Sequence, residues 1–108
     1  MEDLINNIRT AMFEEHERMC AKYGDTYHTS HEAYAVTMEE YEEARDELNI
    51  INASLKGLWS LIKEDCSIAD QVEGIMAHAL RAAAECVQVA ACCHKALQSD
   101  CCRENHDE

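Results

Sequence analysis

Apolar side chains recur at alternating intervals of three and four residues through the middle of the chain. The repeat takes in Tyr41, Ala44, Leu48, Ile51, Leu55, Leu58 and Ile62. Successive residues of an α-helix are turned by about 100°, so this spacing gathers the seven side chains along one side of a helix. We call these seven residues the apolar stripe, and we predict that they form the core-facing side of a helix over residues 30–64.

The start of this helix carries a capping pattern. Thr29 is followed three residues later by Glu32. In this arrangement the threonine hydroxyl and the glutamate carboxylate each accept a hydrogen bond from a free N–H group of the first turn. A helix that begins at Ser30 is therefore expected.

The same apolar rhythm predicts one helix before this one and one after it. The first is expected over residues 2–23, where Gly24 ends it, and the last over residues 68–98. A short polar corner at residues 65–67 joins the two longer helices, with Asp65 or Ser67 as the cap.

Composition agrees with a helical protein. The 108 residues include three glycines and no proline, whereas sheet proteins need turn residues about every eight to twelve positions. The expected fold class is all-α, with a long antiparallel helical hairpin plus an N-terminal helix. Residues 1–98 are expected to form a single domain, and the polar residues 99–108 a flexible tail.

The two longer helices are unusual for so short a chain. Each exceeds 30 residues and would be roughly 45–50 Å long, so the hairpin must protrude from the rest of the domain. Three helices leave apolar faces uncovered. We therefore expect the bundle to be completed by oligomerisation, as a homodimer or a homotetramer.

Carboxylates follow the apolar stripe along the first half of the middle helix. Glu40, Glu43 and Glu47 repeat at the same spacing and fall roughly 60–120° from the middle of the stripe, close enough to point into a groove. A cleft lined with carboxylates suits a hard divalent cation. The alternative is a solvated acidic helix face, and we assign Glu39 and Glu42 to solvent.

An antiparallel hairpin brings a second set of polar residues level with these acids. A corner centred on residues 65–66 would place Glu43 opposite Gln88, and Glu47 opposite Ala84 and Glu85. Glu85 is surrounded in sequence by small apolar residues, and a buried carboxylate without a partner is costly. Glu85 is therefore expected either at the rim of the bundle or beside a cation.

The charge balance limits the partners. The formal net charge is -13, and such a field repels nucleic acid, so direct binding of DNA or RNA is not expected. A small phosphorylated ligand carried with Mg²⁺ remains compatible, because the cation neutralises both partners at one point.

The seven cysteines are predicted to be reduced thiols. The N-terminal residues have neither the basic start nor the apolar core of a signal peptide, and no run of apolar residues approaches the ~18 of a membrane span. A cytoplasmic protein is the expectation. Adjacent cysteines on a helix point about 100° apart, so Cys92-Cys93-His94 and Cys101-Cys102 with His106 fit a zinc site poorly.

Other catalytic patterns are missing from the sequence. The six histidines form no His-x-x-x-His or Glu-x-x-His pair of a di-iron bundle. The chain also has no Gly-rich phosphate loop and no nucleophile elbow. If the protein is an enzyme, water activated by a metal is its expected nucleophile.

Two short motifs resemble those of the MazG-like all-α nucleoside triphosphate pyrophosphohydrolase superfamily, in particular the short bacterial and phage type. The first is Glu39-Glu40-Tyr41-Glu42-Glu43, which matches Glu-x-x-Glu through Glu40 and Glu43. The second is Glu85-Cys86-Val87-Gln88, which meets the family's Glu-x-x-Asp. The resemblance covers roughly residues 15–98.

The resemblance implies Mg²⁺-dependent hydrolysis of a nucleoside triphosphate to the monophosphate and pyrophosphate. It implies that Glu40, Glu43 and Glu85 hold Mg²⁺, that Gln88 orients a ligand or water, and that Glu40 or Glu43 accepts a proton from the attacking water. Arg81, Lys22 and Lys95 are candidate phosphate contacts, although each also fits a solvated surface cation.

The chain departs from the family pattern in two places. Gln88 replaces the usual aspartate, which removes one negative charge and leaves a neutral oxygen ligand. The motifs are also separated by the 41 residues from Ala44 to Ala84, a longer interval than is usual in the family. A nucleotide-binding relative without hydrolysis is therefore kept open.

Two other classes of function remain. A non-enzymatic helical oligomerisation or interaction protein would use the apolar stripe as its interface and the acids for solubility. A metal or thiol sensor would use the cysteine pairs. The sequence indicates no preferred base or sugar.

Overall fold

The computed structural model describes residues 1–104, which form four helices and no strand. They are α1 over Glu2–Tyr23, α2 over Ser30–Lys63, α3 over Ala69–Leu97 and α4 over Asp100–Arg103. The predicted all-α class is confirmed, and so are the three predicted long helices, to within a residue at each end.

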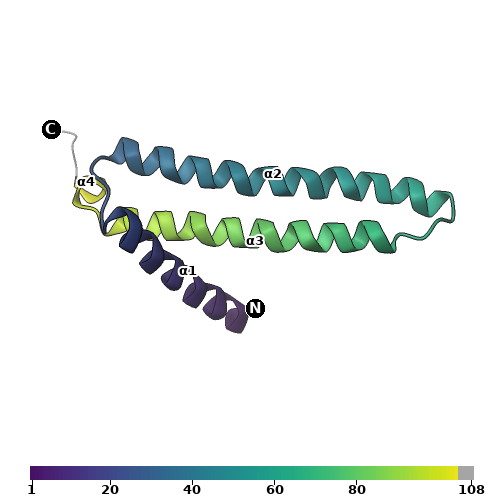
Figure 1. Ribbon diagram of the computed structural model, residues 1–108, viewed down its shortest axis with the longest axis horizontal. Coiled ribbons are helices and arrows are strands. Elements are labelled where there is room, and N and C mark those ends of the chain that lie inside the picture. The colour runs from purple at the N-terminus through teal and green to yellow at the C-terminus, as the bar shows by residue number, and fades with distance from the viewer. Residues whose placement is uncertain (105–108) are drawn as a thin grey trace.

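The long helices form the expected hairpin. Helices α2 and α3 lie side by side and antiparallel, and α1 packs against α3 (Figure 1). The molecule measures 63 × 30 × 26 Å, with a radius of gyration of 18.3 Å. A compact domain of this length would have a radius of about 13 Å, so the hairpin protrudes as predicted.

Local sequence signals fix the junction between α1 and α2. Gly24 follows α1 with φ of 93°, a conformation that glycine adopts without steric cost. At the start of α2 the Thr29 hydroxyl accepts a hydrogen bond from the Glu32 N–H, and the Glu32 carboxylate accepts one from the His28 N–H at 2.8 Å. The Thr29 half of the predicted capping pattern is therefore present, whereas Glu32 binds the N–H one residue before the cap and not that of Thr29.

The corner between the long helices differs from the expected tight turn. Asp65 takes a left-handed conformation with φ of 59°, and the chain then runs back beside α2 before α3 begins, so that α2 projects beyond the start of α3 (Figure 1). The first residues of α3 therefore lie beside a part of α2 that precedes its C-terminal end. This offset changes which side chains meet across the hairpin.

Small residues form the close contact between α2 and α3. Ala44 is 3% exposed, Ala82 5% and Ala91 0%. Alanine has no side chain beyond its β-carbon, so two helices can approach closely wherever alanines face each other. Side chains that flank these alanines are consequently brought near one another.

The apolar stripe is only partly covered. Ala44 is buried and Ile51 and Leu58 are half-buried, but four members remain about half exposed: Tyr41, Leu48, Leu55 and Ile62. The prediction that the whole stripe faces the core is therefore wrong for this chain on its own. These four side chains lie on the side of α2 that neither α1 nor α3 covers.

The residues after α3 are packed against the hairpin as far as they are described. Ser99 is fully buried and α4 follows it, whereas a flexible tail was expected from residue 99. The Ser30 hydroxyl donates to the Cys101 carbonyl at 3.0 Å, which holds α4 beside the start of α2. Residues 105–108, including His106, lie outside the described part of the chain.

Candidate metal centre and adjoining pocket

Three of the predicted site residues converge on one point of the hairpin. Glu40 and Glu43 lie one turn apart on α2, and Glu85 lies opposite them on α3. One carboxylate oxygen from each comes within 4.8 Å of the others. The close contact at Ala44 and Ala82 brings the two helices near enough for this meeting. We call the three residues the carboxylate cluster.

The carboxylate cluster is short of hydrogen-bond donors. Oε2 of Glu40 and Oε2 of Glu85 are shielded from solvent, and neither accepts a hydrogen bond from an N–H or O–H group within residues 1–104. Burial first, and then the charges of Glu43 and Glu85, raises the pKa of Glu40 to about 7. Burial, followed by the neighbouring Glu43, also raises the pKa of Glu85.

These observations fit a divalent cation. Carboxylate oxygens are the ligands that Mg²⁺ and Ca²⁺ prefer, and a cation would satisfy the two shielded oxygens and offset the repulsion among the three acids. Three ligands from two helices leave coordination positions for water or for a ligand's oxygens. The donor set therefore suits Mg²⁺, the cofactor expected from the motifs.

The register prediction for Glu47 is wrong. Glu47 does not meet Glu85; its Oε2 lies 2.6 Å from Nδ1 of His78, two turns earlier on α3. The cause is the offset at the corner, which shifts α3 relative to α2. Glu85 thereby faces Glu40 and Glu43, and Glu47 is left outside the carboxylate cluster.

Gln88 forms a hydrogen bond with a residue of α1. Its Nε2 donates to Oε1 of Glu15 on α1 at 3.4 Å. Glu15 also pairs with Arg18 at 2.5 Å and is largely shielded. Sequence reasoning missed Glu15, because only the packing of α1 on α3 brings it beside the second motif.

A pocket of about 370 Å³ opens beside the carboxylate cluster. Its lining includes Glu40, so the pocket and the cluster share one carboxylate. The remaining lining residues come from α1, the 24–29 connection, α2 and α3: Met19, Tyr23, Thr26, Tyr27, His28, Glu32, Val36, Glu39, Cys92 and Lys95. Glu39, which we had assigned to solvent, borders this pocket while remaining exposed.

Hydrogen bonds of the main chain hold Tyr27, one of the residues that line the pocket. The Ser99 hydroxyl accepts from the Tyr27 N–H and donates to the Lys95 carbonyl, each at 2.8 Å. The Cys101 thiol donates to the Tyr27 carbonyl at 3.4 Å. Tyr27 is consequently 6% exposed and held in place, although nothing in its local sequence distinguishes it from the other tyrosines.

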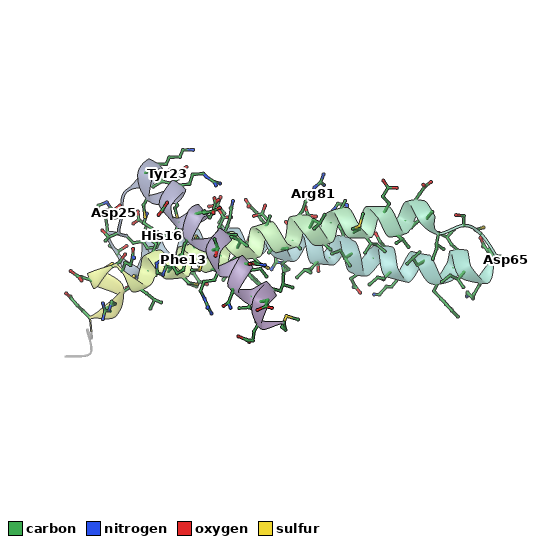
Figure 2. The ribbon with its side chains drawn as sticks, turned by 90° about the horizontal axis from the view of Figure 1, so that it is seen from below. Phe13, His16, Tyr23, Asp25, Asp65 and Arg81 are labelled. Carbon is green, nitrogen blue, oxygen red and sulfur yellow. The ribbon has the colours of Figure 1, made fainter. Side chains whose placement is uncertain are left out.

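The three candidate phosphate contacts have different surroundings. Arg81 and Lys22 are exposed, and Arg81 projects outward from α3 (Figure 2), which agrees with solvated cations. Lys95 is only 3% exposed, with its ammonium 4.5 Å from the centroid of the Tyr27 ring. The solvated alternative is therefore wrong for Lys95.

The cysteines and histidines form no comparable metal centre. Within residues 1–104, the carboxylate cluster is the one group of three or more His, Cys, Asp or Glu side chains close enough to share an ion. Cys92 is buried while Cys93 is exposed, so these adjacent thiols point apart as expected. For Cys101 and Cys102 the expectation is wrong, because their Sγ atoms lie 3.7 Å apart. His16 and His94 instead stack edge to face between α1 and α3, with ring centroids 4.5 Å apart, near Phe13 (Figure 2).

The fold and the site together define an all-α protein that carries a carboxylate cluster on a helical hairpin. None of its helices within the described residues is long and apolar enough to cross a membrane. In comparisons with known proteins, the chain matches no family model, no curated protein and no solved structure. The resemblance to MazG-like enzymes therefore rests on the motif residues alone.

Proposed function

We propose that this protein is a Mg²⁺-dependent nucleoside triphosphate pyrophosphohydrolase, which converts the triphosphate to the monophosphate and pyrophosphate. The observation that carries the proposal is the convergence of Glu40, Glu43 and Glu85 within 4.8 Å. These are the acids of the two motifs that resemble the MazG-like superfamily. A solvated acidic face would not place two carboxylate oxygens out of reach of solvent and of donors.

In this proposal the carboxylate cluster holds the cation. Mg²⁺ bound there supplies positive charge for the phosphate oxygens and makes a bound water more acidic. Glu40 and Glu43 are the candidate acceptors for the proton of the attacking water. Gln88 remains the predicted fourth group, and its hydrogen bond to Glu15 uses the amide nitrogen and leaves the carbonyl oxygen to orient water or ligand.

The pocket supports the same reaction class. It begins at Glu40, so a ligand with its phosphates at the carboxylate cluster would have room for its nucleoside in the pocket. Tyr23, Met19 and Val36 offer apolar surface that a nucleobase can pack against. The remaining lining groups other than Cys92 and Tyr27 are polar, as orientation of a nucleoside requires.

The first test is a pyrophosphate-release assay with the ribo- and deoxyribonucleoside triphosphates and Mg²⁺. We expect Glu43→Ala and Glu85→Ala to lose at least 100-fold in kcat/KM, because each removes a metal ligand. Glu42→Ala is the matched control, since Glu42 is an exposed acid in the same motif. Chelation of Mg²⁺ should abolish turnover.

If the wild-type protein releases no pyrophosphate from any of the nucleotides, the proposed hydrolysis is contradicted. A Mg²⁺-dependent rise in melting temperature that Glu43→Ala removes would then favour the nucleotide-binding relative without hydrolysis. If Mg²⁺ produces no shift either, the carboxylate cluster is no metal centre and the proposal fails.

The rival function is a non-enzymatic helical interaction protein. The half-exposed members of the apolar stripe favour it, because an interface needs no catalysis to explain apolar side chains in solvent. In an inert bundle, acids crowded without a cation repel, so removing one should stabilise the fold or change nothing. The melting temperatures of Glu43→Ala and Glu85→Ala therefore separate the two functions.

Assembly into a homodimer or homotetramer is part of either proposal. Tyr41, Leu48, Leu55 and Ile62 are spaced seven residues apart, and they remain half exposed on the outer side of α2. This is the spacing at which one helix packs against another along its length. We infer that a second copy of the chain covers them.

A further inference from the structure

Lys95 is a buried cation without a counter-ion. Within residues 1–104 its ammonium makes no ion pair and no hydrogen bond, and its close neighbour is the face of the Tyr27 ring at 4.5 Å. Burial of an ammonium is costly unless an acceptor compensates it. The aromatic ring supplies part of this compensation. No oxygen within residues 1–104 accepts a hydrogen bond from the three N–H groups, which leaves them for water or a ligand that enters the pocket.

Lys95 lines the pocket and lies farther along α3 than Glu85 of the carboxylate cluster. Lys95 follows Glu85 by ten residues on the same helix, which is about 15 Å of helix length. Phosphates held at the carboxylate cluster would stay near Glu40, which leaves the rest of the ligand to reach the other pocket residues, among them Tyr27 and Lys95. The part of a nucleotide that lies farthest from its phosphates is the outer edge of the base.

We propose that Lys95 is a specificity-determining residue that selects nucleobases with a carbonyl oxygen on their outer edge. Guanine, uracil and thymine carry such an oxygen, whereas adenine and cytosine carry an amino group at the equivalent place. The inference rests on the proposed function for the identity of the ligand, and it names the substrate class of that site.

The chemistry of the lysine explains the selection. An ammonium group has three donors and no acceptor. It therefore forms a charge-assisted hydrogen bond with a carbonyl oxygen, as lysine does with the O6 and N7 atoms of guanine in DNA. Opposite an amino group, two donors face each other and the buried ammonium stays uncompensated.

The surrounding residues position the ammonium. The Tyr27 ring lies under it, and the Ser99 hydroxyl ties the Tyr27 N–H to the carbonyl of Lys95 itself. Lys95 and Tyr27 are thus held relative to each other by backbone groups and not only by side-chain packing. Tyr27 and Ser99 act as positioning residues in this proposal.

The experiment compares two matched pairs of substrates, GTP with ATP and UTP with CTP, in the pyrophosphate-release assay. For the wild-type protein we expect kcat/KM to favour GTP and UTP by about 10- to 100-fold, the range for one charge-assisted hydrogen bond. Lys95→Met should remove both preferences. Methionine keeps the apolar length of lysine, and replacing a buried charge by an apolar group is often tolerated.

The matched control is Lys22→Met. Lys22 also lies over a tyrosine ring, with its ammonium 5.1 Å from the centroid of Tyr23, but it is exposed. The two variants make the same change of charge in the same kind of contact. Lys22→Met should keep the preference for GTP and UTP that Lys95→Met loses.

A binding measurement separates this inference from the proposed reaction. In a chelator, the rise in melting temperature is measured with each of the four nucleoside monophosphates. GMP and UMP should stabilise the wild-type protein more than AMP and CMP, and Lys95→Met should equalise the four, even if no triphosphate is hydrolysed. Equal shifts for all four, no shift with any of them, or a preference that survives in Lys95→Met would each overturn the role of Lys95.

Discussion

At the scale of single residues, Glu40 connects the two halves of the site. It is a member of the carboxylate cluster and also lines the pocket. Its shielded oxygen and its acidic neighbours disfavour the ionised form, which is why its pKa rises to about 7. A bound cation would favour the ionised form and reverse this effect.

The raised pKa of Glu40 predicts how stability depends on pH in a chelator. Its pKa is about 7 in the fold against 4.5 ordinarily, so between these values the folded protein binds more protons than the unfolded chain. Stability is then fully present below about pH 4.5 and falls as the pH rises to about 7, by roughly 1–2 kcal/mol after screening. Glu40→Gln should reduce this loss, as measured by urea unfolding at pH 5 and pH 7.5.

Two comparisons check this pH prediction. Glu42→Gln, an exposed change in the same helix, should keep the wild-type pH dependence. Mg²⁺ should raise the melting temperature more at pH 7.5 than at pH 5, because the ionised carboxylates are the ligands. If the wild-type protein and Glu40→Gln lose the same stability over this range, Glu40 is not the group that titrates.

At the scale of the elements, the long helix α2 contains a glycine in its interior. Gly57 lies within it, is exposed, and has nothing within 4 Å of the place where a β-carbon would stand. Glycine in a helix interior adds backbone freedom to the unfolded chain and contributes no side-chain contact. The helix persists because tertiary contacts with α3 support it.

Gly57→Ala should therefore stabilise the protein by about 0.5–1 kcal/mol in urea unfolding. Gly24 provides the opposite case, because its φ of 93° is unfavourable for alanine even though the space around it is open. Gly24→Ala should destabilise by about 1 kcal/mol. A loss of stability in Gly57→Ala would indicate that a partner packs against this point of α2.

At the scale of the whole molecule, the chain buries few large side chains. Among residues 1–104, the buried apolar residues are Tyr27, Cys92 and the alanines at positions 33, 44, 82 and 91. Apolar side chains of α2 and α3 such as Leu48, Leu55 and Met76 stay at least half exposed. Apolar burial is the main favourable contribution to folding. An elongated hairpin with so small a core is expected to gain further burial from another copy of the chain.

Sedimentation at micromolar concentration should therefore show a homodimer or homotetramer. The double change Leu48→Glu and Leu55→Glu should shift the protein to a smaller species, because it places charges on the exposed side of α2. Lys56→Glu also changes charge on exposed α2, and it should leave the assembly intact. A monomeric wild-type protein would refute the inference.

The sequence by itself determined the elements. The apolar rhythm, the Thr29 and Glu32 caps and Gly24 act within a few residues, so they predicted three helices to within a residue at each end. The antiparallel hairpin followed from helix length and a short connection. Glu40 and Glu43 were singled out by their spacing beside the apolar stripe and Glu85 by its apolar neighbours in sequence, and the resemblance to a known family then grouped the three as one site.

The tertiary structure decided which side chains meet. The path of the chain after Asp65 shifted α3 against α2, which placed Glu85 beside Glu40 and Glu43 and paired Glu47 with His78. The docking of α1 supplied Glu15, and the packing of Ser99 built the pocket that holds Lys95. Such contacts depend on the offset between helices, which is set by the whole packing and leaves no periodic signal in the sequence.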